Sequence, residues 1–495
     1  MPNIDKRIYT PASVREMDRV AIEDQGIEGY TLMNRAGAGA FVDIGDWFPN
    51  AQRWLVMCGA GNNAGDGYVI GRLALEAGFD VTTVALTKPQ QLRGDAQQAW
   101  QDFQEAGGRV MPFAPGWPPD ADIVIDALLG TGIDRPVTGE YLDAIEAINH
   151  AVLPVVAIDM PSGLNGETGA VMGGAVRADL TVTFVGRKQG FYLNAGPDHV
   201  GEVCFDDLEI PTAAIAHIEP TLRRFTADEL AALLPPRHSS DHKGRFGHVL
   251  IVGGNHGMSG AVRLSGEAAL RSGAGLVSVA MHPDGVASVG AGRPELMVRG
   301  VESSADLDGL IERASVIALG PGLGQDDWSR GLLERVVNAP QPKVLDADAL
   351  NLLAALPIHR DDWILTPHPG EAATLLGCST ADVQADRLSA LRELNQHFGG
   401  VTVLKGHGTL IGAAGEIPFL VDRGNPGMAT AGMGDVLTGM VAGILAQCPE
   451  RPQFAAAAAA FAHAVAGDRA AVGGERGLVA SDLFSELRAV LNSAI

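Results

Sequence analysis

The sequence predicts an α/β protein built from two domains, each with its own sheet. The first observation is length, because the chain has 495 residues and a single hydrophobic core stops growing beyond roughly 250–300 residues. The second is a pattern in both halves, in which short apolar runs bounded by glycine alternate with helical stretches. Such runs are typical of strands that are buried on both faces.

The first half, residues 1 to about 215, contains the strand-like runs RWLVMC, DVTTVALT, ADIVIDALLG, PVVAIDMPSG and LTVTFVG. These runs predict parallel strands in βαβ units. The first run leads into the glycine-rich string GAGNNAGDGYVIGRLA, where we expect a helix to begin at about Gly67. The earlier segment PASVREMDRVAIEDQGIEGYTLMNRAGAGAF has helical spacing and should pack on the sheet or form part of an interface.

A connector with proline, serine and charged residues interrupts this pattern, as at a domain boundary. We assign residues 1–215 to a first domain, 216–225 to a linker and 226–495 to a second domain. The second domain carries the runs HVLIVGG, AGLVSVAM, ASVIALGPG, PKVLDADAL, DWILTPHPGE and VTVLKGHGTL. Residues 455–460, all alanine, predict a buried helix because alanine has the highest helix propensity.

The composition disfavours several functions. A net charge of −23 would repel a polyanion, so we expect no nucleic-acid partner. Cys58, Cys204, Cys378 and Cys448 are far apart, which predicts reduced, mostly buried thiols and no zinc or redox C-x-x-C site. The N-terminus lacks a secretory signal, and no apolar run reaches the roughly 18–20 residues of a membrane span. We therefore expect a soluble cytoplasmic protein.

Glycines after the first strand suggest a ligand-binding turn. Ligands of open α/β sheets lie beyond the carboxyl ends of strands, where such turns expose N–H groups to phosphate. However, Gly59, Gly61 and Gly65 do not match G-x-G-x-x-G, and no acidic residue ends the following strand. Hydride transfer is therefore poorly supported. A tight turn without ligand explains the glycines alone equally well.

Polar residues follow three strands of the first domain: Asn63, Asp66, Asp126, Asp159 and Ser162. Because the carboxyl ends of parallel strands converge on one crevice, these side chains are expected to face one another. A single aspartate at a strand end is more often a helix cap or turn former than a catalyst. Their joint occurrence beside glycine-rich loops favours a site.

The strings NNAGDG, VIDALLGTGIDRPVTG and AIDMPSGLNGETG resemble the YjeF N-terminal family of NAD(P)H-hydrate epimerases, across nearly all of the first 215 residues. The resemblance implies a three-layer, Rossmann-like domain in which Asp159 touches the reacting ring and acts in acid–base catalysis. It implies substrate contacts by Asn62, Asn63, Ala64, Gly65, Asp66, Gly130, Thr131, Gly132, Ile133, Asp134, Arg135, Pro136 and Asp159. It also implies a potassium ion at Asn63, Asp126 and Ser162, whose hard oxygen ligands suit an alkali cation.

The second domain lacks the G-x-x-x-x-G-K-S/T string of a P-loop. Its candidate phosphate site is NPGMATAGMGDVLTG, where Gly432 and Gly434 precede Asp435 at the start of an apolar helix. Free N–H groups and the helix dipole favour a phosphoryl group there, and Asp435 is placed to accept a proton from an attacking hydroxyl. An ordinary helix cap explains the string equally well.

The string KGHGT, which begins at Lys405, offers a cation and exposed N–H groups together, as a phosphate site requires. Taken alone, Lys405 is explained by a solvated charge at a strand end. His368, taken alone, is explained by a buried histidine that bonds to backbone. Glu371 could orient a metal or a water molecule, and we assign it no catalytic role.

The strings GGNHGMSGA, ALGPGLG, VLDADAL, LTPHPGE, LKGHGT and NPGMATAGMGDVLTG resemble the ADP-dependent NAD(P)H-hydrate dehydratase family over about residues 225–490. The resemblance implies a three-layer, ribokinase-like fold, ADP as phosphoryl donor, and magnesium at the phosphate oxygens. It implies contacts with the hydrated nucleotide by Ala261, Gly324, His368 and Asp435. It implies contacts with the adenine nucleotide by Lys405, Gly406, His407, Gly408, Thr409 and Gly434.

Together the resemblances imply a bifunctional repair enzyme. It would epimerise the R and S forms of NADHX and NADPHX and dehydrate the S form to NADH or NADPH, converting ADP to AMP and phosphate. The resemblance also implies a homo-oligomer. The alternative is a ribokinase-like kinase for a vitamin precursor or sugar, fused to a nucleotide-binding scaffold domain.

Overall fold

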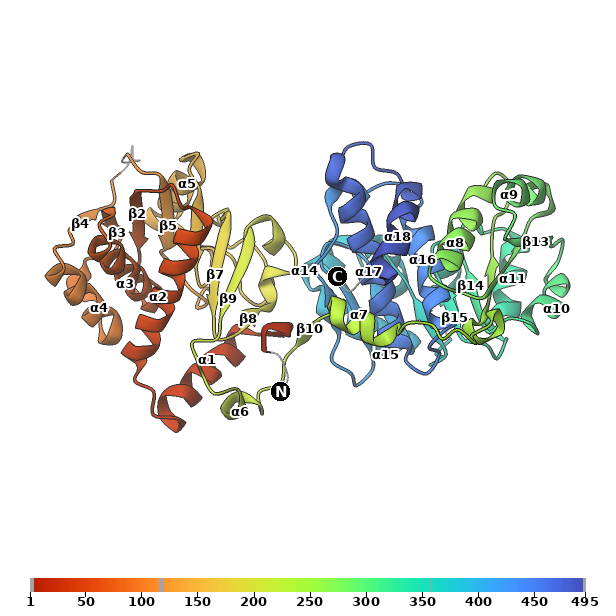
Figure 1. Ribbon diagram of the computed structural model, residues 1–495, viewed down its shortest axis with the longest axis horizontal. Coiled ribbons are helices and arrows are strands. Elements are labelled where there is room, and N and C mark those ends of the chain that lie inside the picture. Colours follow the sequence, from red (N-terminus) through yellow and green to blue (C-terminus); the bar gives the residue numbers. More distant parts are fainter. Residues whose placement is uncertain (1–3, 115–119, 357, 493–495) are drawn as a thin grey trace. The chain divides into compact units, whose positions relative to one another are not determined.

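The computed structural model describes residues 4–114, 120–356 and 358–492. The chain forms two compact units, Met1–Leu222 and Arg223–Ile495. Each unit contains helices and a sheet that is wholly or mainly parallel (Figure 1). The predicted α/β class is therefore confirmed for both halves.

The sheet of the first unit has the order β4-β3-β2-β5-β6-β7-β9, and all neighbouring strands are parallel. The strands are β2 (Arg53–Cys58), β3 (Asp80–Ala85), β4 (Val110–Pro112), β5 (Ile123–Ala127), β6 (Val155–Ile158), β7 (Leu180–Phe184) and β9 (Glu202–Asp206). Outside this seven-stranded sheet, β1 (Arg7–Tyr9) pairs in parallel with β8 (Arg187–Lys188).

Helices cover both faces of this sheet. The helices are α1 (Pro11–Arg19), α2 (Gly29–Trp47), α3 (Asn62–Glu76), α4 (Gly94–Glu105) and α5 (Glu140–His150). Along β2, Val56 belongs to the core shared with α1–α4, whereas Leu55 and Met57 belong to the core shared with α5. The run RWLVMC is apolar throughout because successive side chains enter different cores.

The expected start of the first glycine-rich helix at Gly67 is wrong, because α3 already begins at Asn62. Gly61 is its N-cap, and the Gly61 carbonyl accepts hydrogen bonds from the amides of Ala64 (3.1 Å) and Gly65 (3.3 Å). The string NNAGDG therefore forms the first turns of the helix. This places the free N–H groups of the helix start beside β2.

The sheet of the second unit has the order β13-β12-β11-β14-β15-β16-β17-β18-β19, and β10 pairs with β19. Neighbours from β13 to β17 are parallel, whereas β18 is antiparallel to both β17 and β19. The strands are β10 (Leu222–Arg224), β11 (His248–Val252), β12 (Leu276–Met281), β13 (Met297–Gly300), β14 (Val316–Leu319), β15 (Lys343–Leu345), β16 (Trp363–Leu365), β17 (Val401–Leu404), β18 (Thr409–Ala413) and β19 (Phe419–Val421).

Helices also cover both faces of the second sheet. The main core joins the sheet to α7 (Ala227–Leu233), α8 (Ser259–Arg271), α16 (Met433–Leu445), α17 (Pro452–Ala470) and α18 (Leu483–Asn492). On β18, Ile411 enters this core, whereas a side chain on the next residue, Gly412, would meet Leu391 of α15 (Arg387–Phe398). The predicted three-layer arrangement is confirmed. Residues 455–460 are buried within α17, as predicted.

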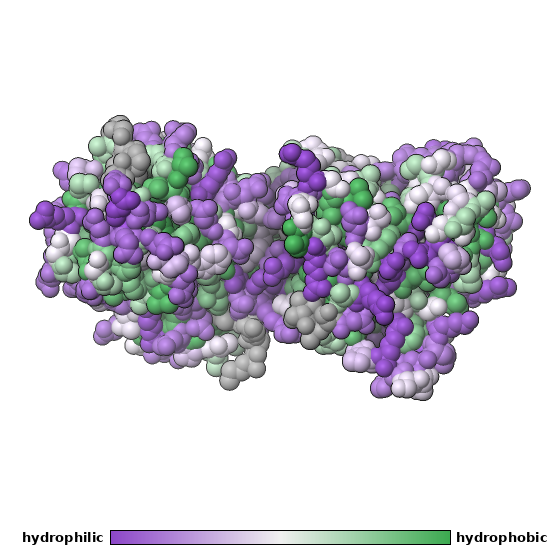
Figure 2. Space-filling model, turned by 45° about the horizontal axis from the view of Figure 1, so that its top comes forward, coloured by the Kyte–Doolittle hydropathy of each residue, from purple (hydrophilic) through white to green (hydrophobic). Residues whose placement is uncertain are grey.

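Hydrophilic residues cover much of the face shown in Figure 2, with smaller hydrophobic areas between them. None of the described helices is long and apolar enough to cross a membrane. All four cysteines are unpaired, and Cys58 and Cys448 are buried. Cys378 is exposed, which corrects the expectation for that thiol.

Candidate active sites

A cavity of about 1130 Å³ opens at the carboxyl ends of β2, β5 and β6 in the first unit. Ligand sites usually enclose about 300–1,000 Å³, so the cavity is large enough for a dinucleotide. Most of the predicted contacts line it: Asn62, Asn63, Asp66, Gly130, Thr131, Gly132, Ile133, Asp134, Arg135, Pro136 and Asp159. The helix α1 adds Asp18 to the same wall.

Two predicted contacts do not line this cavity. Ala64 is fully buried within the core of the unit. Gly65 is also buried, and a side chain on it would meet Met33 of α2 at 2.6 Å. Helical spacing explains this, because consecutive residues of α3 point in different directions and only one stripe faces the cavity.

Asp126 and Ser162 are fully buried and bonded to each other beneath the cavity residues. The Ser162 hydroxyl donates to Asp126 Oδ1 (2.6 Å), and the Ser162 amide donates to Asp126 Oδ2 (2.8 Å). The Ser162 hydroxyl also accepts from the Leu129 amide (2.9 Å). Burial raises the pKa of Asp126 to about 6. The hydrogen bonds of Ser162 with Asp126 and Leu129 connect the loop after β6 to the end of β5 and the loop after it.

Asn63 has a buried side chain whose amide oxygen and nitrogen have no hydrogen-bond partner among the described residues. A methyl group on Gly130 would lie 3.5 Å from Asn63 Cβ and 3.8 Å from Asp159 Oδ2. Gly130 therefore leaves open space between these two side chains. An unpartnered buried amide is costly, and a ligand in the cavity would remove that cost.

Asp159 follows β6 with a left-handed backbone (φ 64°). Its carboxylate accepts a hydrogen bond from the ammonium group of Lys188, which is fully buried. Lys188 also donates to Thr183 Oγ1 (2.8 Å) and to the Phe184 carbonyl (3.1 Å). The three acceptors fix the position of the Lys188 Nζ, which holds the Asp159 carboxylate at the cavity wall.

Two further carboxyl groups share this site. Burial raises the pKa of Asp18 to about 6, although Lys188 partly opposes the shift. Burial raises the pKa of Asp66 well above its usual range, and repulsion from Asp159 and Asp18 adds to it. The site therefore places two carboxyl groups with raised pKa values, Asp18 and Asp66, beside the Asp159–Lys188 pair.

The candidate site of the second unit lies at the start of α16. Gly432 is the N-cap with a left-handed backbone (φ 88°), and Asp435 lies in the first turn. Burial raises the pKa of Asp435 to about 6, and repulsion from Asp346 adds to the rise. A side chain on Gly434 would lie 3.5 Å from Lys405 Nζ, so the glycine leaves space in front of that cation.

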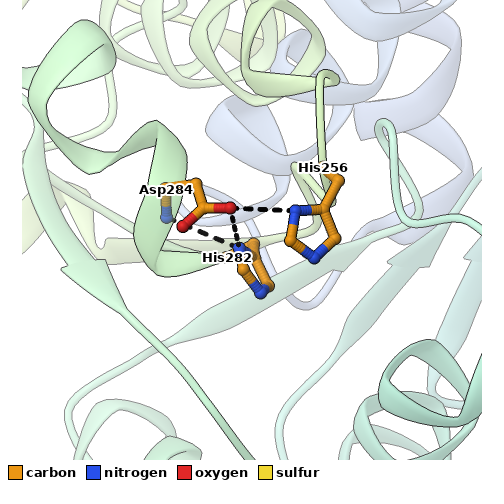
Figure 3. Close-up of side chains that lie close together, drawn as sticks. All are labelled: His256, His282 and Asp284. Atoms are coloured by element: carbon orange, nitrogen blue, oxygen red, sulfur yellow. Dashed lines mark hydrogen bonds and ion pairs between the residues drawn. The ribbon is translucent and has the colours of Figure 1, made fainter.

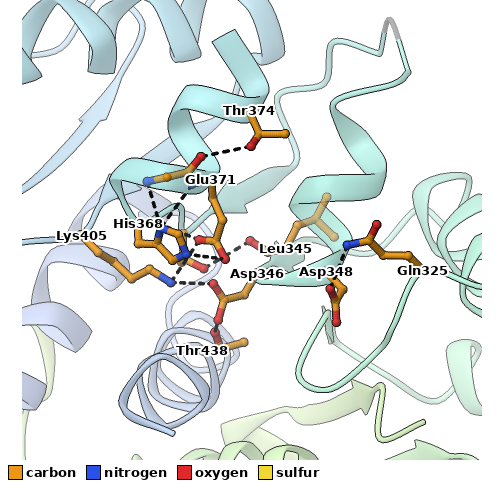
Figure 4. Close-up of polar contacts among 11 residues, drawn as sticks. Gln325, Leu345, Asp346, Asp348, His368, Glu371, Thr374, Lys405 and Thr438 are labelled. Atoms are coloured by element: carbon orange, nitrogen blue, oxygen red, sulfur yellow. Dashed lines mark hydrogen bonds and ion pairs between the residues drawn. The ribbon is translucent and has the colours of Figure 1, made fainter. Parts of the chain in front are cut away.

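Lys405 lies in a network of carboxylates at the ends of β15, β16 and β17 (Figure 4). Its ammonium group donates to Asp346 Oδ1 (2.8 Å) and lies 3.6 Å from Glu371 Oε2. Asp346 Oδ2 accepts from the Thr438 hydroxyl on α16 (2.6 Å). Burial alone would lower the pKa of Lys405, but the neighbouring carboxylates raise it. The solvated-charge alternative for Lys405 is therefore wrong.

His368 caps α13 (Pro369–Leu376) beside this network. Its Nδ1 accepts from the amides of Gly370 (3.0 Å) and Glu371 (3.2 Å), and Glu371 Oε2 accepts from the His368 amide (2.8 Å). The side chain is 57% exposed, so the buried-histidine alternative is wrong, although the bonds to backbone are present. Its other ring nitrogen, Nε2, lies 3.4 Å from Glu371 Oε1.

Ala261 lies near the segment 322–324, which follows β14. Ala261 lies in the first turn of α8, and a side chain on Gly322 would approach its Cβ at 3.2 Å. The Gly324 amide donates to Asp348 Oδ2 (2.9 Å). The Ser265 hydroxyl on α8 donates to the Asp435 carbonyl (2.8 Å), which fixes α8 against α16.

The whole chain matches known proteins at high identity. It is 46% identical to the bifunctional NAD(P)H-hydrate repair enzyme of Coxiella burnetii, over 98% of this chain and 99% of that protein. It is 42% identical to the enzyme of the same description from Escherichia coli, over 100% of this chain and 95% of that protein. The chain belongs to the family of bifunctional NAD(P)H-hydrate repair enzymes.

Two family models match separate parts of this repair-enzyme chain. Residues 29–190 match the YjeF-related protein N-terminus, and residues 249–488 match NAD(P)H-hydrate dehydratase. The predicted resemblance is confirmed in both halves. The chain is thus a two-domain enzyme with an epimerase-type and a dehydratase-type domain.

Solved structures match the second unit of the repair enzyme. A ribokinase-like superfamily protein from Enterococcus faecalis aligns with a TM-score of 0.52 and 32% identity, over 55% of this chain and 96% of that one. An ADP/ATP-dependent NAD(P)H-hydrate dehydratase from Bacillus subtilis, co-crystallised with ATP and Mg²⁺, aligns with a TM-score of 0.50 and 30% identity, over 54% of this chain and 97% of that one. The predicted ribokinase-like fold is confirmed.

Sequence reasoning missed several polar residues of the repair enzyme's two sites. Lys188 follows the strand run LTVTF within FVGRKQG, and Asp346 ends the run PKVLD, so both carry the signal of a charge directly after a buried strand. Arg387 carries no such signal, because it lies at the start of a helix. Its guanidinium donates to the carbonyls of Leu404 (3.2 Å), Lys405 (3.3 Å) and Gly408 (3.2 Å). These bonds hold the KGHGT loop.

Proposed function

We propose that this chain repairs hydrated NADH and NADPH in two steps, one in each unit. The first domain interconverts the R and S hydrates, and the second dehydrates the S hydrate with ADP. The observation that carries the proposal is the presence, in one chain, of two acid–base centres that each lie beside a glycine, Gly130 and Gly434. These centres are Asp159 with Lys188 and Asp435 with Lys405.

In the epimerase step, the C–O bond of the hydrated ring breaks to give an iminium-like cation, and water returns on the other face. The carboxylate of Asp159 stabilises this cation. Lys188 holds Asp159 in place through its hydrogen bond. The departing hydroxide takes up a proton, and Asp66, which lines the cavity and whose pKa burial raises, is the proposed source of that proton.

A potassium ion fits the residues beneath the cavity. The unpartnered amide oxygen of Asn63 supports this part of the proposal, because an oxygen donor without a partner suits a hard cation. Asn63, Asp126 and Ser162 would hold the ion. Its positive charge would stabilise negative groups of the bound nucleotide.

In the dehydratase step, Asp435 accepts the proton of the ring hydroxyl as that oxygen attacks the β-phosphorus of ADP, and AMP leaves. Lys405, Gly434 and the N–H groups of the KGHGT loop hold the phosphates. Phosphate then departs from the ring as the ring nitrogen supplies electrons. Loss of a proton from the neighbouring carbon restores the double bond of NADH or NADPH.

Magnesium fits the second site. Asp346, Glu371 and Asp435 bring three carboxyl groups to one ammonium, that of Lys405, which leaves an excess of negative charge. Mg²⁺ binds through one or two carboxylates together with substrate phosphates. Asp346 and Glu371 would hold the ion, whose charge would offset that of the phosphates. A cytoplasmic location belongs to the same proposal, since four unpaired cysteines suit a reducing compartment.

The experiment supplies mixed R and S hydrates with ADP and Mg²⁺ and follows recovery of the reduced-nicotinamide absorbance. The unmodified chain should repair both epimers. Asp435→Asn should stop repair, whereas Asp159→Asn should repair the S epimer at the normal rate and leave the R epimer. Accumulation of a stable phosphorylated product, without release of phosphate, would replace the proposal with a small-molecule kinase.

A further inference from the structure

A cluster of two histidines and one aspartate lies in the second unit, apart from the residues assigned to catalysis. His256, His282 and Asp284 each offer one ligand atom, and these three atoms lie within 4.8 Å of one another. Among the residues that the structure describes, no other group of three or more histidine, cysteine or acidic side chains has metal-binding spacing. Figure 3 shows both rings and the carboxylate directed toward one another.

The cluster comes from two loops that the sheet brings together. His256 lies between β11 and α8, and His282 and Asp284 follow β12. Since β11 and β12 are neighbouring parallel strands, their carboxyl ends lie at one edge. The His282 amide donates to the Gly254 carbonyl (3.2 Å), which joins the two loops next to the cluster. This backbone hydrogen bond, as well as the contacts between the three side chains, therefore holds the ligand atoms close together.

The distances suit one small dication. His256 Nδ1 lies 2.9 Å from Asp284 Oδ2, and His282 Nδ1 lies 3.5 Å from the same oxygen. With bonds of about 2.0–2.2 Å, two ligand atoms of a tetrahedral zinc ion are about 3.3 Å apart. Small side-chain rotations would therefore place an ion between the three atoms. His282 Nδ1 would give up a long hydrogen bond from the Asp284 amide (3.4 Å).

Stability of the fold does not account for the cluster. The side chains of His256 and Asp284 are 67% and 68% exposed, and exposed ion pairs contribute only about 0–1 kcal/mol. The two imidazole rings lie 3.7 Å apart, centroid to centroid. The neutral form of imidazole is the form that binds metal, so an ion would take the place of ring protons at this cluster.

We propose that His256, His282 and Asp284 form a binding site for a Zn²⁺-class dication. Two imidazoles and one carboxylate suit such an ion, and three protein ligands leave a position open for water or another ligand. The ion would link residues 253–258 to the short helix Pro283–Gly285, which follows β12. It is distinct from the hard-cation site proposed at Asp346 and Glu371.

The loop that would be clamped continues into the proposed substrate site. Asn255, next to His256, donates from its side chain to the Leu323 carbonyl (3.0 Å) and to Asp326 (2.9 Å). Gly324 lies between these two partners. A bound ion would therefore restrain the loop beside Gly324. An effect of this restraint on the substrate site rests on the proposed function, whereas binding of the ion does not.

The test measures Zn²⁺ binding by isothermal titration calorimetry and Co²⁺ binding by visible absorption. It uses the full chain without an affinity tag, in excess Mg²⁺ to fill carboxylate sites, and with Cys378→Ser to remove the exposed thiol. We expect one Zn²⁺ per chain. His256→Asn, His282→Asn and Asp284→Asn should each weaken binding by about tenfold or more. Hydrogen exchange of residues 253–258 should slow when Zn²⁺ is added.

A matched control is His359→Asn. His359 Nε2 lies 3.8 Å from Asp361, so it forms a comparable exposed histidine–aspartate pair outside the cluster. This variant should bind Zn²⁺ as the parent does. The proposal is overturned if the parent binds no Zn²⁺, or if the three cluster variants bind it as tightly as the parent. Because no readout depends on repair, failure here leaves the proposed function standing, and the reverse is also true.

Discussion

The ammonium group of Lys188 donates a hydrogen bond to the carboxylate of Asp159 at the wall of the first unit's cavity. The lysine is fully buried, and Asp159 is its acidic partner. A buried ion pair of this kind costs desolvation energy, so its presence beside a cavity indicates a functional use.

Lys188→Met should slow epimer exchange by about 100-fold, because Asp159 would lose the hydrogen bond that holds its carboxylate in place. The measurement is the interconversion of R and S hydrates, followed by chromatography. Dehydration of pure S hydrate by the same variant is the internal control and should not change. Exchange at the normal rate would show that the lysine serves only the fold.

The pH dependence of dehydration should report Asp435. This carboxyl group must be ionised to accept a proton, and its pKa is raised to about 6. The value of kcat/KM should therefore fall about tenfold per pH unit below this pKa and level off above it. A profile that stays flat down to pH 5, measured with saturating Mg²⁺, would contradict the assignment of Asp435 as the base.

Asp18→Asn should stabilise the first unit, and more so at higher pH. In the folded state the pKa of Asp18 is about 6, against 3.8 as its ordinary value, so folding becomes less favourable as pH rises through this window. Asparagine does not ionise. Its stabilising effect should therefore grow by about 1.4 kcal/mol between pH 5 and pH 8.

Unfolding in urea at the two pH values measures this difference for Asp18→Asn. The control is Asp46→Asn, which changes an exposed carboxyl group on α2. Its effect should be equal at pH 5 and pH 8. An equal effect for Asp18→Asn as well would mean that burial does not shift its titration.

Arg387→Lys should raise the KM for ADP by about tenfold while epimerisation is unchanged, because lysine lacks the planar fork whose Nη1 donates to Gln384 and whose Nη2 donates to the carbonyls of Leu404, Lys405 and Gly408. Steady-state kinetics with varied ADP measures the effect. Arg392→Lys changes an exposed arginine of the same helix and should leave the KM unaltered. A loss of kcat alone, with the same KM, would place Arg387 outside nucleotide binding.

Local sequence patterns predicted the strands and the position of Asp159 and Asp435 at the ends of elements, but they placed the start of the first glycine-rich helix at about Gly67 instead of Asn62. These patterns failed for residues whose role depends on the direction in which the side chain points. Gly65 and Asp66 are adjacent in the string NNAGDG, yet Asp66 lines the cavity and Gly65 faces α2. One residue along a helix rotates the side chain by about 100°, and the sequence alone did not indicate which stripe faces the ligand.

The sequence by itself determined two α/β units and membership of a family of repair enzymes, because apolar runs, glycine spacing and motif order are local properties. Only the tertiary structure decided which charges meet. Lys188 is 29 residues from Asp159, and Lys405 is 59 residues from Asp346. Ionisation depends on burial and on charges a few ångströms away, and packing between distant segments sets both.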